Sequence, residues 1–486
     1  MVWRWLGRGL LALLGLVLVL GAVVLINTLR YAPTPVADAP TETREVDIKR
    51  AAANLSRAIQ FKTVSALAVR REFTGFRAWL SEAYPRVHGA MRREVIGGGT
   101  LLYTWPGKDS AAQPVLLTGH YDVVPAQRSA HRPWKHKPYA GVVDQKFVWG
   151  RGALDDKGAV IAMLEAAEAL IAKGFQPKRT VYFSFGHDEE VGGKGAKAVV
   201  EHLKRQNVRF VWSLDEGSFV LDGIVPGLVH PVASINVAEK GYVTLVVVAK
   251  GEGGHSSLPP TNTAVGRLAK AIDKLQSNPV PGGLTGLSAE FFDNVGRNFS
   301  FERRLLFANR WLFGPLIENI LSRSNSTNAM LRTTTAPTML SGSIKENVLP
   351  TEARAVVNFR LHPRDTIESV LTHVRQVIDD DQVTVRISKR SGVGEATPVS
   401  SHTSAGYKLI ADSFRDVFSP VIVIPGLTIA ATDSRHYGEI SDDSYRIIPF
   451  TIGQRDIPRI HGTNERLSLD NLKRGIVLFK VLIERI

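Results

Sequence analysis

The chain has 486 residues, of which 44% are hydrophobic and 22% are charged, so its length and composition favour two folded domains with accessory segments. It contains no cysteine, which excludes disulfides, thiolate metal sites and a cysteine nucleophile and leaves His, Asp and Glu to hold any metal. The formal net charge is +14, but the basic residues are dispersed and form no nucleic-acid-binding motif, so we favour a solvated basic surface and predict no nucleic-acid partner.

The first predicted element is a membrane helix within residues 1–30. Residues 9–26 are 18 consecutive positions without a charge, and as a helix they would span roughly 27 Å, close to the thickness of the hydrocarbon core of a bilayer. Arg4 and Arg8 precede this run and only Arg30 closely follows it, so the positive-inside rule places the N-terminus in the cytoplasm. We therefore predict a single-pass anchor, with the rest of the chain on the periplasmic, extracellular or lumenal side.

A cleaved signal peptide is the competing interpretation of this segment. The apolar run is long for a signal peptide, and residues 27–30 offer no small-residue cleavage site. Residues 37–39 resemble such a site but lie far from the apolar run. The anchor is therefore favoured, and the proline-containing residues 31–45 are predicted to form an extended tether.

Alternating strands and helices predict an α/β domain in residues 46–236. We predict strands at 115–118, 181–185 and 210–214 and a helix at 159–173. This alternation implies a mixed, largely parallel sheet flanked by helices. Such sheets bind their ligands beyond the carboxyl ends of the strands.

The pattern changes near Gly241. Predicted strands at 242–248, 353–360 and 383–387 and a helix at 367–378 form a separate α+β module. We place this inserted module at 237–389 and expect residues 390–486 to return to the first domain.

Four groups of acidic and imidazole residues follow the predicted strands or lie at glycine turns. They are GHYDVVP at 119–125, GRGALDDKG at 150–158, HDEE at 187–190 and LDEG at 214–217. Carboxylates at strand ends are desolvated and repel one another unless a cation neutralises them, so a divalent metal explains why they gather. Each group alone also fits an ordinary loop pair or helix start, and the metal site is favoured by their occurrence together.

With these groups the chain resembles the dinuclear zinc peptidases that include aminoacylase-1, carnosinase, succinyl-diaminopimelate desuccinylase and the Gly-X carboxypeptidases. The resemblance runs from about residue 46 to the C-terminus and is closest to the branch of Gly-X carboxypeptidases and N-fatty-acyl-amino-acid synthase/hydrolases. It implies a catalytic domain with an inserted lid and dimerisation domain, a homodimer, and two Zn²⁺ per subunit, although Co²⁺ or Mn²⁺ would suit the same ligands. The phrases that carry it are Leu214-Asp215-Glu216-Gly217, Gly253-Gly254-His255-Ser256-Ser257 and Thr432-Asp433-Ser434-Arg435.

The resemblance also implies roles for single residues in catalysis. Glu189 would be the general acid/base, and Asp122 would orient a histidine ligand. The peptide bond between Asp155 and Asp156 would be cis. The implied metal ligands are Asp155 as the bridge between the two ions, His120 and Asp215 on one ion, and Glu190 and His461 on the other.

Four further residues are implied to contact the substrate. His255, often supplied by the partner subunit, would stabilise the oxyanion, and Asn347 would lie near it. Arg360 would grip the substrate carboxylate with its two-pronged guanidinium. Arg435 is a weaker second candidate, since a salt bridge to Asp433 or another neighbour would explain it equally well. An ordinary loop histidine is the alternative for His255.

Residues 291–313 depart from the plain family pattern. They hold six of the chain's 20 phenylalanines together with Trp311. A helical insert that packs its own core is one interpretation. An apolar channel for an acyl chain and a surface held against the membrane or a partner are the others, and the hypothesis of a fatty-acyl substrate depends on the channel.

The predicted function is zinc-dependent hydrolysis of an amide bond next to a free carboxylate, in an N-acyl amino acid or a dipeptide. The same site would catalyse the reverse condensation of a fatty acid with an amino acid. A catalytically inactive, membrane-tethered binding protein on the same fold is the alternative, and the intact Glu189 and metal ligands argue against it. A lipid- or polyanion-binding protein is the third class, and it predicts salt-sensitive binding without metal.

Overall fold

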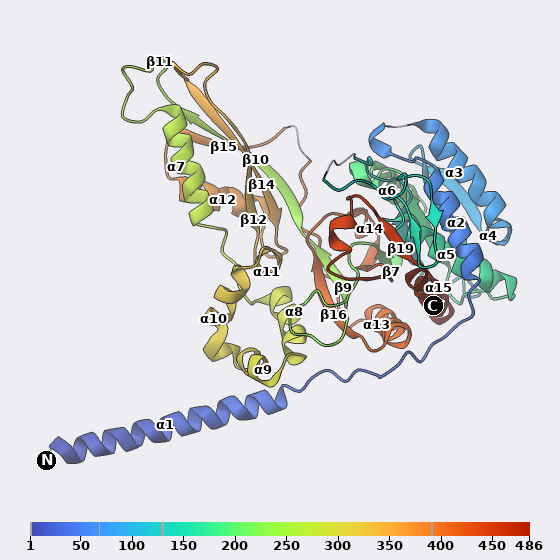
Figure 1. Ribbon diagram of the computed structural model, residues 1–486, viewed down its shortest axis with the longest axis horizontal. Helices are drawn as coiled ribbons and strands as arrows, with labels where there is room; N and C mark the ends of the chain where they lie inside the picture. The colour runs from blue at the N-terminus through green and yellow to red at the C-terminus, as the bar shows by residue number, and fades with distance from the viewer. Residues whose placement is uncertain (1, 68, 128–130, 390–391) are drawn as a thin grey trace. The chain divides into compact units, whose positions relative to one another are not determined.

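The computed structural model describes the whole chain except residues 1, 68, 128–130 and 390–391, and it divides into two compact units. Unit 2 combines Pro35–Ala238 with Val399–Ile486, and unit 1 combines Met1–Thr34 with Glu239–Pro398 (Figure 1). The sequence-based limits of the inserted module stay a prediction, and the predicted start of the last segment at residue 390 lies outside the described residues.

Unit 2 is built on a ten-stranded sheet with the order β1-β2-β6-β3-β7-β17-β9-β8-β18, in which β16 also pairs with β9. The central strands β6, β3, β7 and β17 are mutually parallel, so their carboxyl ends meet at one edge, whereas β1 and β2 are antiparallel. The strands are β1 Arg92–Ile96, β2 Thr100–Trp105, β3 Val115–His120, β6 Val181–Gly186, β7 Phe210–Asp215, β8 Val220–Leu221, β9 Val232–Glu239, β16 Ile422–Thr428, β17 Ser441–Arg446 and β18 Thr451–Ile452. A smaller sheet pairs β4 Val142–Val143, β5 Phe147–Trp149 and β19 Arg466–Ser468.

Helices cover both faces of the central strands. Successive side chains of a strand point to opposite faces, and Leu116 of β3 packs in one hydrophobic cluster with Val199 of α6. Gly119 lies on the other face, where Val160 and Met163 of α5 come within 3.5 Å of the place its Cβ would take. A side chain would not fit there, because that place is only 2.4 Å from Oδ2 of Asp156. The helices of unit 2 are α2 Ile48–Gln60, α3 Arg70–Ala83, α4 Pro85–Ala90, α5 Lys157–Ala172, α6 Lys194–Arg205, α13 Ala405–Phe418, α14 Ser434–Tyr437 and α15 Leu469–Arg485, with 3₁₀ turns η1 Ser65–Leu67, η2 Glu189–Val191 and η3 Ile457–Arg459.

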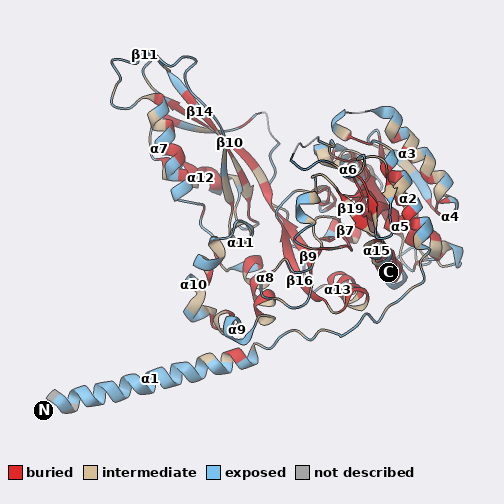
Figure 2. Ribbon diagram, in the orientation of Figure 1, coloured by how far each residue is buried: buried red, intermediate tan, exposed pale blue. Residues whose placement is uncertain are grey.

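The three strands and the helix predicted in the first domain are confirmed as β3, β6, β7 and α5. α5 is buried along almost its whole length (Figure 2). Its apolar residues therefore occur on all sides of the helix, and the helical periodicity of its sequence is weak. The segment after Val399 returns to the first sheet, because β17 pairs with β7.

Unit 1 contains a four-stranded antiparallel sheet with the order β12-β14-β10-β15. Helices α7 and α12 pack on this sheet and form a hydrophobic core with it, which confirms the predicted strands and helix of the α+β module. The elements are α7 Ala264–Ser277, α12 Ile367–Ile378, β10 Gly241–Lys250, β12 Thr334–Ser341, β14 Glu352–Leu361 and β15 Val383–Ile387, with a two-stranded pair of β11 Gly254–His255 and β13 Val348–Leu349.

A helical insert and the N-terminal helix complete unit 1. Helix α1, Val2–Arg30, is long and apolar enough from Trp5 to Arg30 to cross a membrane, and it is exposed except near its C-terminal end (Figure 2). The insert comprises α8 Gly286–Arg297, α9 Phe301–Ala308, α10 Arg310–Ser322 and α11 Asn325–Leu331.

Most of the phenylalanines of residues 291–313 pack inside this insert. Phe292 and Phe307 are buried in its core, and Phe291, Phe299 and Phe313 pack against them. The helices α8 and α9 approach closely because Gly296 has no side chain, since a Cβ there would lie 2.6 Å from the ring of Phe307. These contacts support the interpretation of the segment as an insert with its own core.

Candidate functional site

The candidate site lies at the carboxyl edge of the parallel strands in unit 2. His120 ends β3, the turn η2 with Glu189 and Glu190 follows β6, and Asp215 ends β7. Because these strands are parallel neighbours, their ends bring polar side chains from distant parts of the chain to one place.

Asp155 lies between two histidines. Its Oδ1 is 3.0 Å from Nε2 of His120, and its Oδ2 is 3.1 Å from Nε2 of His461. The same Nε2 of His461 is 3.2 Å from Oε2 of Glu190. The peptide bond between Asp155 and Asp156 is cis, as the resemblance implied.

Two overlapping groups of ligand-type atoms meet at His120. In one group the ligand atoms of His120, Asp155 and Glu190 lie within 4.8 Å of one another, and in the other those of His120, Glu189 and Glu216 do so. Four of the five predicted metal ligands are therefore clustered, because His461 contacts Asp155 and Glu190.

Asp215 stays a predicted ligand, and Glu216 is a further acidic residue beside it. Asp215 is buried at the end of β7, but neither group of ligand-type atoms includes it. Its Oδ1 instead accepts a hydrogen bond of 2.9 Å from the backbone N–H of Glu216. Glu216 was named from the sequence only as part of the motif at 214–217 and was given no role. Its position directly after Asp215 was the one feature of the sequence that could have pointed to it.

Asp122 connects the His120 ring to the turn that carries Glu189. It is fully buried, and its Oδ1 lies 3.4 Å from Nδ1 of His120. Its two oxygens accept hydrogen bonds of 3.2 Å from the backbone N–H groups of Glu189 and Glu190. The contact supports the predicted orienting role and adds a second one, because the same carboxylate positions the η2 turn.

Glu465 holds the loop of Asp155 in place, and sequence reasoning gave it no role. Its Oε1 accepts hydrogen bonds from the backbone N–H groups of Gly152, Leu154 and Asp155 at 2.9, 2.9 and 3.1 Å. Its Oε2 lies 2.5 Å from Nη1 of Arg151, and both side chains are buried.

Arg151 extends this connection to the histidine at the other end of the chain. Its Nη2 donates hydrogen bonds of 3.0 Å to the backbone carbonyls of His461 and Gly462. One buried ion pair therefore ties the Asp155 loop to the His461 loop. A buried Arg and Glu separated by more than 300 residues carry no local sequence signal.

The charges of the cluster explain why a metal fits it. Burial opposes ionisation of Asp155, but the hydrogen bonds from His120 and His461 outweigh it and hold the pKa of Asp155 well below its ordinary value. Hydrogen bonds to Asp155 and Glu190 raise the pKa of His461 to about 10. The carboxylates thus keep imidazoles protonated, and a divalent cation would take the place of these protons.

Glu189 and Glu216 behave differently, because burial raises the pKa of both carboxyl groups well above the ordinary value. A carboxyl group with a raised pKa binds a proton more readily than an ordinary one, which suits a general acid/base.

Asp433 and Arg435 do not form the salt bridge considered as an alternative. In the part of the chain that the structure describes, neither carboxylate oxygen of Asp433 has a hydrogen-bond partner. The Nε of Arg435 instead lies 3.4 Å from Nε2 of His436. Burial, with Asp215 and Asp122 nearby, raises the pKa of Asp433 well above its ordinary value.

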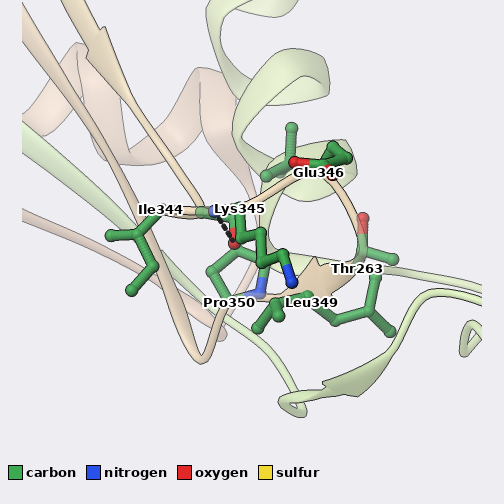
Figure 3. Close-up of a pocket in the computed structure, with 9 residues that line it drawn as sticks. Thr263, Ile344, Lys345, Glu346, Leu349 and Pro350 are labelled. Carbon is green, nitrogen blue, oxygen red and sulfur yellow. Dashed lines mark hydrogen bonds between the residues drawn. The ribbon is translucent and has the colours of Figure 1, made fainter.

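The remaining predicted residues belong to unit 1. His255 on β11 is exposed, and its Nδ1 lies 2.7 Å from Oγ of Ser257. Asn347 lies beside it, because His255 pairs with Val348 and the backbone carbonyl of Asn347 accepts from the N–H of Ser256. Figure 3 shows a pocket next to this strand pair, which is lined by unit 1 residues alone. Its volume is about 490 Å³.

Arg360 is far from that pair within unit 1. It lies on β14 opposite Tyr242, with its guanidinium carbon 4.8 Å from the centre of the Tyr242 ring. From Glu352 to Arg360 the strand β14 advances eight residues, roughly 26 Å, away from the β13 end. One small substrate therefore cannot touch Arg360 and His255 of the same unit 1.

Comparison with known proteins agrees with this geometry. Residues 116–485 match the model of peptidase family M20/M25/M40. The "Probable carboxypeptidase S-like 2" of Dictyostelium discoideum is 39% identical over 442 residues, which cover 89% of this chain and 84% of that protein. The "N-fatty-acyl-amino acid synthase/hydrolase PM20D1" of Xenopus tropicalis is 38% identical over 498 residues, which cover 99% of this chain and 96% of that protein.

Solved structures share the fold at lower identity. Human carnosine dipeptidase 1 aligns with a TM-score of 0.61 at 17% identity, and the alignment covers 90% of this chain and 96% of the dipeptidase chain. The M20 family metallo-carboxypeptidase Sso-CP2 from Sulfolobus solfataricus aligns with a TM-score of 0.62 at 18% identity, and the alignment covers 89% of this chain and 98% of the Sso-CP2 chain.

A mixed α/β fold with clustered histidines and carboxylates at the carboxyl edge of its sheet defines a hydrolase of the metallopeptidase class. Three quarters of the chain match the family model, and the Dictyostelium relative is 39% identical over most of both chains, so the chain is an enzyme of peptidase family M20/M25/M40.

Proposed function

We propose that the chain is a two-metal amidohydrolase that cuts the amide bond next to a free carboxylate, in an N-acyl amino acid or a dipeptide. The observation that carries the proposal is the position of Asp155, whose two oxygens face the Nε2 atoms of His120 and His461. A carboxylate placed in this way suits a bridge between two cations. Glu189 in the adjoining group supplies the acid/base that amide hydrolysis needs.

The donors fit a pair of divalent ions. The ligands are imidazole and carboxylate, which suit Zn²⁺ and also Co²⁺ or Mn²⁺. The buried Oε1 of Glu190 has no hydrogen-bond partner among the described residues, which leaves it available to a cation. When bound, the ions would lower the pKa of a water molecule and polarise the scissile carbonyl. The residues that would hold them are Asp155, His120, Asp215, Glu190 and His461.

Glu189 moves the protons. Its carboxylate takes a proton from the attacking water and returns it to the nitrogen of the leaving amino acid. The raised pKa of its buried carboxyl group increases its affinity for the proton that it takes up. Asp122 keeps Glu189 next to His120 through the backbone N–H of Glu189.

Substrate recognition is assigned to unit 1. Arg360 grips the substrate carboxylate, whereas His255 and Asn347 stabilise the oxyanion. Since Arg360 and His255 lie at opposite ends of β14, a complete site needs the two groups from different copies of the chain, which supports a homodimer. The exposed Met339 and Leu340 on edge strand β12 offer an apolar surface for such a dimer.

The names of the relatives support two substrate classes. The Xenopus protein is named for N-fatty-acyl amino acids and the Dictyostelium protein for carboxypeptidase activity. We propose the fatty-acyl class, with condensation as the reverse reaction. Helix α1 anchors the enzyme, with its catalytic unit on the non-cytoplasmic side.

Amino-acid release by the full chain in detergent tests this function. The panel holds a long-chain N-acyl phenylalanine, N-acetyl phenylalanine and Gly-Leu, each with and without chelator and added Zn²⁺. Chelator-sensitive release from the long-chain substrate is the expected result. Release from Gly-Leu alone would make the enzyme a dipeptidase. Release from none of them, with metal present, would favour the inactive binding protein.

A further inference from the structure

The helical insert of unit 1 is joined to the membrane helix by a polar contact. Asn309, which separates α9 from α10, is fully buried, and its Nδ2 donates to the backbone carbonyl of Val24 at 3.1 Å and to Oγ1 of Thr28 at 3.3 Å. Its Oδ1 accepts from Nδ2 of Asn27 at 3.0 Å. The Tyr31 hydroxyl also donates to the backbone carbonyl of Asp293 on α8. Such side-chain amides join helices at membrane level.

This contact fixes the depth of the α9–α10 junction along α1. Val24 precedes Arg30 by six residues, so its carbonyl lies roughly 9 Å inside the end of α1. It also belongs to the uncharged run of residues 9–26. If α1 crosses a bilayer, the junction at Asn309 must therefore lie at the boundary between head groups and hydrocarbon.

The next residues along the chain are apolar and exposed. Trp311 is 61% exposed, and Leu312, Leu316 and Ile320 of α10 are 40%, 50% and 50% exposed. Leu312, Leu316 and Ile320 are four residues apart, so they form one stripe along the helix. We call these three residues the α10 stripe.

A neighbouring face of α10 is already occupied. Ile317 is buried in the core of the insert, and Phe313 and Leu321 pack against that core. The α10 stripe is therefore an apolar face that the insert leaves uncovered, on the helix that begins directly after Asn309. Tryptophan beside such a stripe is typical of the interfacial zone of a bilayer.

We propose that α10 lies in the outer boundary of the bilayer, with Trp311 and the α10 stripe in contact with lipid. This inference rests on the proposed membrane anchor and adds a second attachment to it. Because the α9–α10 junction is bound to α1 through Asn309, insertion of the anchor brings the stripe to the lipid without any further change. Unit 1 is then held against the membrane at two contacts and cannot rotate freely about a single tether.

The absence of cysteine from the chain allows a direct test. Single substitutions Leu312→Cys and Leu316→Cys in the full chain are labelled with an environment-sensitive fluorophore and reconstituted into vesicles of phosphatidylcholine and phosphatidylglycerol. Lipids carrying a spin label in the upper acyl chain then quench probes that reach the bilayer. The matched control is Gln376→Cys, which is exposed on α12 of the same unit, and Leu16→Cys in α1 marks full insertion.

We expect the probes at 312 and 316 to be quenched at least about twofold more than the probe at 376, with emission shifted to the blue. If the protein floats with the vesicles but the probes at 312 and 316 are quenched no more than the probe at 376, the inference is wrong and the membrane anchor is still supported. Cross-linking of two chains through position 316 by a short bismaleimide would assign the stripe to a second copy and overturn it too. Failure to float would refute the anchor itself and the inference with it.

Discussion

Replacement of Glu465 tests whether one buried ion pair holds the two halves of the metal site together. Glu465 and Arg151 are both buried, and the pair joins the Asp155 loop to the backbone of His461. Glu465→Ala removes the acceptor of three backbone N–H groups and leaves the guanidinium buried without its partner. Both loops lose the group that fixes their separation.

The structure sets the size of the effect. Breaking a buried ion pair by removing one partner costs about 3–5 kcal/mol, because the remaining charge is desolvated and unpaired. Loss of groups that orient metal ligands weakens metal binding about 10- to 100-fold. Glu465→Gln keeps an oxygen for the N–H groups but faces Arg151 with its amide, so it should weaken metal binding while costing less stability than Glu465→Ala.

Two measurements on the full chain in detergent check this prediction. Denaturant unfolding of the metal-free protein gives the loss of unfolding free energy in unit 2, and competition with a chelating dye gives the metal affinity. Glu201→Gln is the matched control, since Glu201 is 53% exposed and its contact with Lys204 is a surface one, so it should change stability by at most about 0.5 kcal/mol.

Arg151→Met completes a double-mutant cycle with Glu465→Gln. If the two residues act as a pair, the double variant loses less stability than the sum of the single losses. Unfolding and metal affinity of Glu465→Ala equal to those of the Glu201→Gln control would refute the reasoning.

Three further predictions concern the metal, the insert and a buried lysine. Asp155→Asn should abolish binding of the second equivalent of Zn²⁺, measured by isothermal titration. The wild type should release protons when it binds Zn²⁺, because His461 is protonated without metal. Binding of Zn²⁺ by the wild type without proton release would contradict the second expectation. Phe307→Ala should destabilise unit 1 by about 3–5 kcal/mol in denaturant unfolding, because Phe307 is buried. Trp311 is exposed, so Trp311→Ala should cost at most about 0.5 kcal/mol. Equal losses of unfolding free energy in the two variants would count against the packing described. Burial, followed by Arg360, lowers the pKa of Lys240 from 10.5 to about 7. The unfolded chain keeps the Lys240 proton to higher pH, so the free energy of unfolding should rise with pH between about 7 and 10, by at most about 1.4 kcal/mol per pH unit. Lys240→Met should reduce that rise. A pH profile that the substitution leaves unchanged would show that Lys240 does not cause the rise.

Local patterns were enough to predict the strands that build the catalytic edge. β3, β6 and β7 are short apolar runs that end at His120, at the turn of Glu189 and at Asp215, and their parallel order follows from the helices between them. Helix α12 and strand β15 have the bounds that the sequence predicted, since both are bordered by polar residues and carry one apolar face.

Contacts across the chain could not be predicted in the same way. Glu465 approaches Asp155 only after the chain has returned from unit 1, so nothing near it in sequence indicates its partners. Glu216 was overlooked because the neighbouring Asp215 matched the family pattern and took the assigned role. The role of residues 291–313 depended on which face of each helix is covered, and composition does not contain that information.

The most direct test of the central claim is to compare the metal content and turnover of Glu189→Gln with those of the wild type. Both are prepared as the full chain with Zn²⁺, and amino-acid release from an N-acyl amino acid is measured beside the zinc bound per chain. We predict the same zinc content in both proteins and a fall in kcat of about 10²- to 10⁴-fold in the variant, because the acid/base is lost and the ligands remain. Turnover that survives the substitution, or wild-type turnover that survives complete removal of metal, would contradict the proposed mechanism.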